Sequence, residues 1–166
     1  MRKAALICLV CLGLPSALRA AKPLIKFDGG IGVIPVSNVT NVGGVVTVSP
    51  NIVRGVNPPG QIWRIDSLTA DVDVNGRIVV NGRGLLLGGG NNIGLNANQS
   101  VHATLICEPS SPFTEHSTPS AGVPLDENGD FRIDDFLDPP PPPDCASPVL
   151  LIRSVGGAWF AAGILK

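Results

Sequence analysis

The stretch Ser67–Val80, SLTADVDVNGRIVV, gives the clearest indication of the fold. Apolar and polar residues alternate in its first half, which is the period of a half-buried strand. The alternation places four apolar side chains on one face: Leu68, Ala70, Val72 and Val74. Asn75-Gly76 then separates this strand from the apolar run Arg77–Val80. Asn-Gly between two such runs favours a type I′ turn, in which both turn residues have positive φ, so the stretch predicts a β-hairpin.

Short strands of the same kind recur along the rest of the chain, and no segment after residue 20 has the period of a helix. Several short strands separated by Gly, Pro and Asn are typical of an antiparallel sandwich or barrel. We therefore predict one all-β domain over residues 21–166, an antiparallel β-sandwich that is Ig-like in general architecture. Its other strands are expected at 32–36, 45–49, 51–54, 61–66, 84–87, 101–107, 123–125, 131–136, 148–155 and 158–164.

The last two of these strands form the most apolar hairpin in the sequence. PVLLIRSV and AWFAAGIL flank Gly156-Gly157, which predicts a turn between two central strands. Aromatic residues make up only 4% of the chain. Trp159 and Phe160 are therefore expected to supply much of the aromatic core.

The first 20 residues have the layout of a secretory signal peptide. Arg2 and Lys3 precede an apolar run of 11 residues, Ala4–Leu14, which is short of the roughly 20 residues that span a bilayer as a helix. Small residues follow and end at Ala20, where we expect cleavage; an uncleaved anchor is the alternative. The sequence thus predicts a bacterial exported protein, secreted or periplasmic, with no transmembrane segment after cleavage.

Charge argues against nucleic acid as a partner. Loss of three basic residues with the signal peptide leaves nine basic residues against 13 acidic ones, a net charge of −4. A mildly acidic chain without a Lys/Arg stripe lacks the electrostatic footprint of nucleic-acid binding. No other partner is indicated by the composition.

Two cysteines, Cys107 and Cys145, lie after the predicted cleavage site. An even pair in an oxidising compartment predicts a disulfide. Alternation within 101–107 also turns Cys107 toward the core, with Val101, Ala103 and Leu105. A zinc site is the alternative, but two cysteines without clustered histidines form a poor one.

Signatures of catalysis are missing from residues 21–166, which contain no G-x-S-x-G, H-E-x-x-H or C-x-x-C. His102 is expected on the solvent face of its strand, and His116 in a loop. A small secreted hydrolase that uses one of these histidines with nearby carboxylates is the enzymatic alternative. Asp71 and Asp73 share a strand face at about 7 Å, a separation that would suit an inverting glycosidase but is commoner on a solvated face.

The segment Asp126–Leu137, DENGDFRIDDFL, resembles a calcium loop only in part. An EF-hand needs Gly at position 6 and a bidentate Glu at position 12, where this segment has Phe131 and Leu137. We therefore predict a hairpin with Asn128-Gly129 at its turn, joining 123–125 to 131–136, with Phe131, Ile133 and Phe136 packing inward. A looser calcium site stays open, and its candidate ligands are Asp126, Asn128, Asp130 and Asp134.

Loops on a rigid sandwich are where recognition usually takes place. The Gly/Asn-rich loop 88–99 and the Pro-rich loop 108–124 are therefore the expected interaction surfaces. The uninterrupted run Pro139–Pro143 is expected to be extended polyproline, about 16 Å long, and to act as a stiff spacer leading to Cys145.

A series of segments resembles a group of secreted bacterial proteins that have no assigned function. In chain order these segments are GGIGVIPVS, VRGVNPPGQ, GRGLLLGGG, ATLIC, GDFRIDD, CASPVLLIR and WFAAGI. The resemblance covers nearly all of residues 21–166 and implies export and a Cys107–Cys145 pairing. It implies no catalytic residue and no cofactor.

The functional expectation is a non-enzymatic extracytoplasmic module, structural or ligand-binding. A calcium-stabilised adhesion-type module and, less favoured by the sequence, a small secreted hydrolase are the alternatives.

Cleavage can be tested directly. Sequencing the N-terminus of the exported protein should give Ala21 or a residue one or two positions away, because the small residues before it match a cleavage site. An N-terminus at Met1 in the exported fraction would instead support the anchor alternative.

Overall fold

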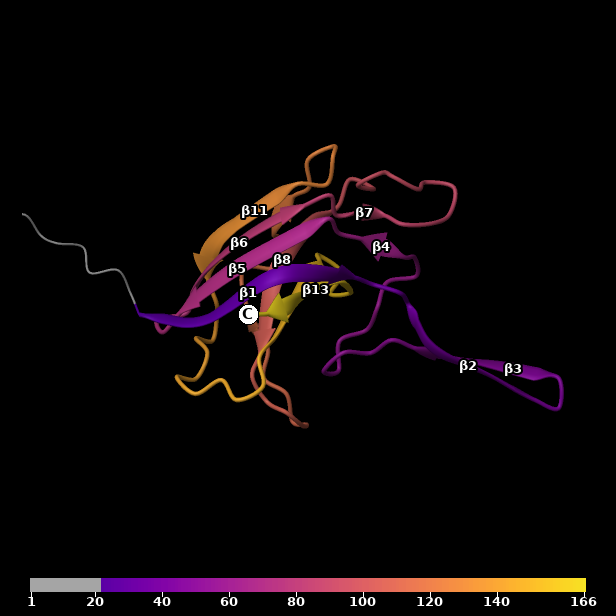
Figure 1. Cartoon of the computed structure of the whole chain (residues 1–166), viewed down its shortest axis with the longest axis horizontal. Coiled ribbons are helices and arrows are strands. Elements are labelled where there is room, and N and C mark those ends of the chain that lie inside the picture. The colour runs from indigo at the N-terminus through magenta and orange to yellow at the C-terminus, as the bar shows by residue number, and fades with distance from the viewer. Residues whose placement is uncertain (1–21) are drawn as a thin grey trace, which may run out of the picture.

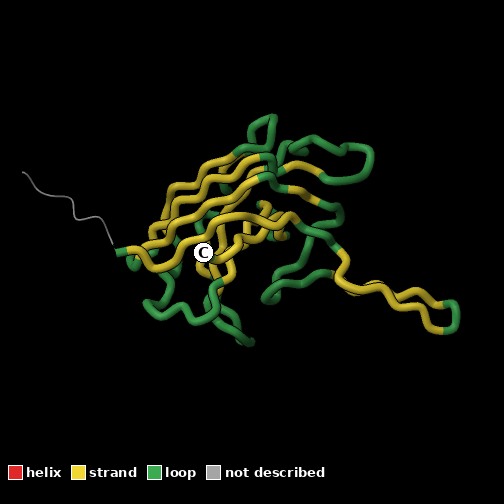
Figure 2. Tube along the Cα trace, viewed as in Figure 1, coloured by secondary structure: helices red, strands yellow, loops and turns green. Residues whose placement is uncertain are grey.

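A computed structural model of the chain describes residues 22–166, so the predicted signal peptide, residues 1–20, lies outside the described residues. The described chain contains strands, turns and loops and no helix, as the sequence predicts (Figure 2). The strands are β1 (Pro23–Gly32), β2 (Val36–Val42), β3 (Val45–Pro50), β4 (Trp63–Arg64), β5 (Ser67–Asp73), β6 (Arg77–Arg83), β7 (Leu86–Leu87), β8 (Ser100–Ile106), β9 (His116–Ser117), β10 (Val123–Pro124), β11 (Phe131–Phe136), β12 (Val149–Ser154) and β13 (Trp159–Leu165).

Nine of these strands form one antiparallel sheet in the order β10-β8-β12-β13-β1-β5-β6-β11, with β9 also paired to β8. The sheet curls until it is nearly barrel-shaped, which is compatible with the predicted sandwich (Figure 1). A turn connects its two ends: the N–H of Asp126 donates to the carbonyl of Asp130 at 2.9 Å, between β10 and β11. The remaining strands form two small sheets, β2-β3 and β4-β7.

Strand β1 connects the two halves of the curled sheet. Its residues 23–28 pair with β5 and its residues 27–32 pair with β13, so Phe27 pairs with both neighbours. The register with β13 shifts between Phe27 and Gly30, an irregularity at which the strand can bend from one half of the sheet to the other. The sequence analysis placed a strand at 32–36 instead, and this was wrong because β1 ends at Gly32.

The core lies between the two halves of the sheet and confirms the predicted alternation. Leu68, Ala70 and Val72 of β5 are buried, and Val74 is exposed because it has entered the turn. The closing hairpin β12–β13 is also confirmed, with Trp159 and Phe160 both buried. Phe160 stacks on Trp63 of β4 with 4.0 Å between the ring centroids.

The turns at the two Asn-Gly pairs occur where predicted but with a different geometry. Gly76 and Gly129 have positive φ, whereas Asn75 and Asn128 do not. A turn with only its last residue in this region is a type I turn followed by a left-handed glycine, rather than type I′. The β5–β6 hairpin forms as predicted. The second turn does not close a hairpin, because β10 pairs with β8 and β11 pairs with β6.

Strand β8 is buried on both faces, which the sequence analysis did not predict. Val101, Ala103 and Leu105 face the core as expected, but His102 and Thr104 on the other face are also buried. Side chains distant in sequence lie against the second face: the Thr104 hydroxyl is 2.9 Å from the Ser117 hydroxyl and accepts from the Arg153 guanidinium at 3.4 Å. Strand β9 also pairs along the edge of β8.

The disulfide predicted between Cys107 and Cys145 is present. It ties the end of β8 to the segment that enters β12, and Cys107 is buried as expected. The proline run before it packs against the β5–β6 turn, because a Cβ at Gly76 would lie 3.3 Å from Pro140 and Pro141. The run is therefore a packed connector as well as a link to Cys145.

Gly82 on β6 lies directly against the ring of Phe131 on β11, and a Cβ at this glycine would overlap the ring. Gly82→Ala should lower the free energy of unfolding by about 1–3 kcal/mol, the usual cost of overpacking a core. Gly60→Ala is the matched control, since no atom lies within 4 Å of the added methyl group. Denaturant unfolding measures the free energy of unfolding of both variants. Phe131→Leu should reduce the loss of stability that Gly82→Ala causes. Equal losses for Gly82→Ala and Gly60→Ala would contradict the packing of Gly82 against Phe131.

Candidate functional site

The hairpin formed by β2 and β3 projects from the body of the molecule (Figures 1 and 2). We call residues Val36–Pro50 the arm. Its two strands pair only with each other among the described residues, in a register that sets Val39 opposite Val48 and Val42 opposite Val45. Every residue of the arm is exposed. The arm therefore contributes nothing to the core described above.

Exposed valines lie on both sides of the arm, among uncharged polar residues. Its six valines are between 38% and 77% exposed, and the two beside the turn, Val42 and Val45, are the most exposed of them. No charged residue occurs between Asp28 and Arg54, so the arm lies within the longest charge-free run of residues 22–166. An exposed apolar patch of this kind usually marks an interaction site in a folded protein.

Backbone groups add to this surface. Because β2 and β3 form a two-stranded ribbon, each has an outer edge whose N–H and C=O groups meet no other strand among residues 22–166. Free edges of this kind are templates for pairing with another chain, and folded proteins usually blunt them with charges or cover them. The arm has neither a charge nor a cover.

A groove of about 410 Å³ lies at the base of the arm. We call it the base groove. None of its lining residues is charged, and two of its isoleucines, Ile34 and Ile62, are exposed. The residues that line it include Ile34, Val36, Gln61, Ile62, Gly89 and Gly90.

The sequence analysis found only part of this surface. It predicted β3 at 45–49 but missed β2, and it did not single out the arm. Of the two predicted interaction loops, 88–99 contributes Gly89 and Gly90 to the base groove. Loop 108–124 instead packs against the body through β9, β10 and Phe113, over which Arg54 lies. The absence of charge from residue 29 to residue 53 is a feature of the sequence that could have indicated the arm.

The expectation that His102 faces solvent is wrong, because the residue is only 4% exposed. Its register partner across the sheet is Arg153, whose guanidinium binds Glu115 at 2.5 Å and the carbonyl of Gly157 at 2.9 Å. Burial, and then the positive charge of Arg153, lower the pKa of His102, while Glu115 acts in the opposite direction. No hydrogen bond joins His102 to a serine or a carboxylate in the described chain.

His116 is also buried and lies in β9 rather than in an open loop. Its Nδ1 atom is 2.8 Å from the carbonyl oxygen of Pro139, so the ring connects β9 to the proline run. The neighbouring Ser117 hydroxyl is 2.9 Å from the Thr104 hydroxyl, not bonded to either imidazole. The structure thus gives His116 a packing contact and does not assemble a serine–histidine pair around it.

The four candidate calcium ligands have separate structural partners. Asp130 accepts from the N–H of Gly84, and Asn128 accepts from the N–H of Asp130, so both stabilise the turn. Asp134 lies on β11, where it pairs with Arg77 at 2.7 Å and Arg132 at 3.1 Å. Asp126 contributes backbone hydrogen bonds to the turn. Within residues 22–166, no three His, Cys, Asp or Glu side chains are grouped to hold a metal ion.

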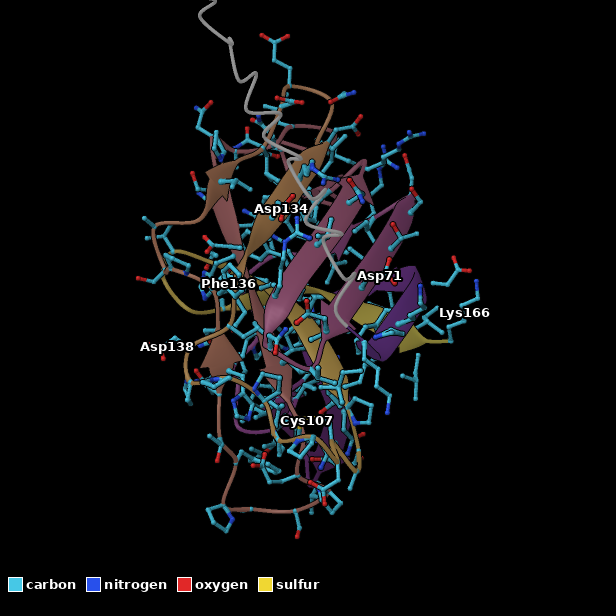
Figure 3. All side chains as sticks on the ribbon, turned by 90° about the vertical axis from the view of Figure 1, so that its left-hand side faces the viewer. Asp71, Cys107, Asp134, Phe136, Asp138 and Lys166 are labelled. Atoms are coloured by element: carbon cyan, nitrogen blue, oxygen red, sulfur yellow. A yellow bond between two sulfur atoms is a disulfide. The ribbon has the colours of Figure 1, made fainter. Side chains whose placement is uncertain are left out.

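Asp71 and Asp73 also have separate partners. Asp71 pairs with Lys26 at 2.6 Å on the outer face of the sheet, where Figure 3 labels it together with Asp134. Asp73 accepts from the N–H groups of Asn75 and Arg77 and so closes the β5–β6 turn.

The prediction that Phe136 packs inward is wrong, because this residue is 57% exposed on β11. Phe131 and Ile133 are buried, as expected.

No family model, curated protein or solved structure matches the chain. Across residues 22–166, no helix has the length and apolar character needed to cross a membrane.

The buried His102 gives a pH test. Because its pKa is lowered in the folded protein, the unfolded state takes up a proton near the ordinary value of about 6.5 while the folded state stays neutral. Stability should therefore fall as pH decreases from about 7 toward the folded pKa. Unfolding measured at several pH values should show a smaller loss for His102→Gln over this range. Equal losses in both proteins would show that His102 does not titrate as described.

Proposed function

We propose that this protein is an exported, non-enzymatic module that works outside the cytoplasm by making contacts, and that the arm and the base groove are its contact surface. The observation that carries the proposal is the arm itself, which exposes six valines and two free strand edges. The arm adds nothing to the core and exposes apolar surface and unpaired backbone groups to water. Contact with a partner would bury this surface and pair these groups.

Export is supported by two independent features. The N-terminal 20 residues have the layout of a signal peptide, and the folded domain contains a disulfide, which persists in oxidising compartments. A secreted or periplasmic location agrees with both.

A non-enzymatic role is supported by where the titratable groups lie. Both histidines are buried: the charges of Arg153 and Glu115 act on the pKa of His102, and His116 is hydrogen-bonded to the Pro139 carbonyl. A hydrolase would need a nucleophile and a base within hydrogen-bond reach of each other. The acidic residues once considered for calcium serve turns and ion pairs, so no observation favours a calcium-dependent role over a simple contact role.

The proposal predicts that the arm touches a partner in the cell. A photoreactive phenylalanine analogue placed at Val48 of the full chain should yield a cross-linked product of higher mass in the exported fraction. The same analogue at Phe136 is the matched control, because that residue is naturally aromatic, is exposed, and lies on β11 away from the arm (Figures 1 and 3). An arm that cross-links nothing, in protein that is exported and folded, would overturn the contact role.

A further inference from the structure

We propose that the partner of the arm is a second copy of this chain. In the arrangement we infer, two arms lie side by side and antiparallel, and the tip of each arm enters the base groove of the other copy. The inference rests on the proposed function, since it names the partner of the same surface.

The tip of the arm and the base groove have matching chemistry. Val42 and Val45 face each other at the tip and are 77% and 67% exposed, and Gly43-Gly44 between them adds no side chain. The groove offers Ile34 and Ile62 as apolar walls. Neither surface carries a charge, so burying one against the other leaves no unpaired ion.

The tip of the arm cannot reach the base groove of its own chain. It extends away from the body, so its tip lies at the far end from the base where the groove opens (Figure 1). A lone two-stranded hairpin is marginally stable in water. A second copy would fill the base groove and stabilise the hairpin. Each arm would pair with a strand of the other arm, and each base groove would bind the tip of the other arm.

The size of the surface fits a dimer. Strand β2 has seven residues, which gives the arm a length of about 23 Å at the usual rise of about 3.3 Å per residue. Together the arm and the base groove supply about 20 residues, the number that each partner contributes to a standard interface. The arrangement is closed by a two-fold axis, since every tip–groove contact occurs twice.

A second copy fits the arm better than a membrane surface does. Proteins that lie on membranes present Trp or Phe beside Lys or Arg. The sequence has no aromatic residue between Phe27 and Trp63 and no basic residue between Lys26 and Arg54. Away from the arm, the described chain has more acidic than basic residues, so two copies meet with least repulsion along the charge-free run.

Sedimentation velocity over a range of concentrations tests the inference, on protein purified after expression of the full chain. The wild type should be a dimer that dissociates on dilution. Val42→Asp with Val45→Asp should weaken the dimer by about 100-fold or more, because each tip would bury two charges. At a concentration at which both proteins are monomeric, the melting temperature should not change, since the arm lies outside the core. Val155→Asp is the control, at a residue that is 55% exposed and belongs to neither the arm nor the base groove.

A complementation experiment separates tip–groove contact from association of the arms alone. Ile62→Lys should also give monomers, by placing a charge in the groove. Mixing this variant with Val42→Asp/Val45→Asp should restore a heterodimer, because one intact tip meets one intact groove and the second contact brings opposite charges together. A dimer that tolerates Ile62→Lys, or a mixture that stays monomeric, would overturn the tip–groove arrangement.

Failure of this inference is distinguishable from failure of the proposed function. If the wild type stays monomeric at high concentration while Val48 cross-links to a different protein in cells, the contact role stands and the self-association is wrong. Binding of the monomer to phosphatidylglycerol vesicles through the arm would likewise overturn the second copy as partner. If the arm neither cross-links nor self-associates, both proposals are wrong.

Discussion

The bend in strand β1 is the constraint on which the rest of the structure depends. One strand pairs with β5 over residues 23–28 and with β13 over residues 27–32, so it belongs to both halves of the curled sheet. The register shift between Phe27 and Gly30 lets it turn this corner. A side chain at Gly30 would press on Leu68, a fully buried core residue, so the bend and the core fit one another closely. Without the bend the two halves could not face each other across one core.

The same strand explains why the arm exists as a separate feature. Only three residues separate the end of β1 from the start of β2, so the chain leaves the corner and extends away from the body (Figure 1). The core is complete without the arm. Strand β8 is buried on both faces, and the disulfide joins the end of β8 to the segment before β12. The arm therefore exposes apolar surface that the body does not bury, and the proposed intermolecular contact would cover it.

Features set by local pattern could be predicted from the sequence, and features set by distant packing could not. The β5–β6 and β12–β13 hairpins and the cysteine pair followed from alternation, turn residues and pairing rules. Burial of His102 did not, because segments far away in sequence bury the second face of β8. Strand β2 was missed because its valines lie three residues apart and so lack the two-residue alternation of a half-buried strand. The base groove was missed because Ile34, Ile62 and Gly89 meet only in the fold.

Hydrogen exchange at two protein concentrations tests whether a second copy covers the arm, because it reports backbone protection in the unmodified chain. If two copies associate through their arms, amides of β8 and β12 should exchange slowly at both concentrations. Amides of the arm should be protected in the concentrated sample and exchange rapidly after dilution. Arm amides that stay protected at every dilution would show that the arm packs within its own chain. Arm amides that exchange rapidly at both concentrations would show that no second copy covers it, and either result would contradict the account.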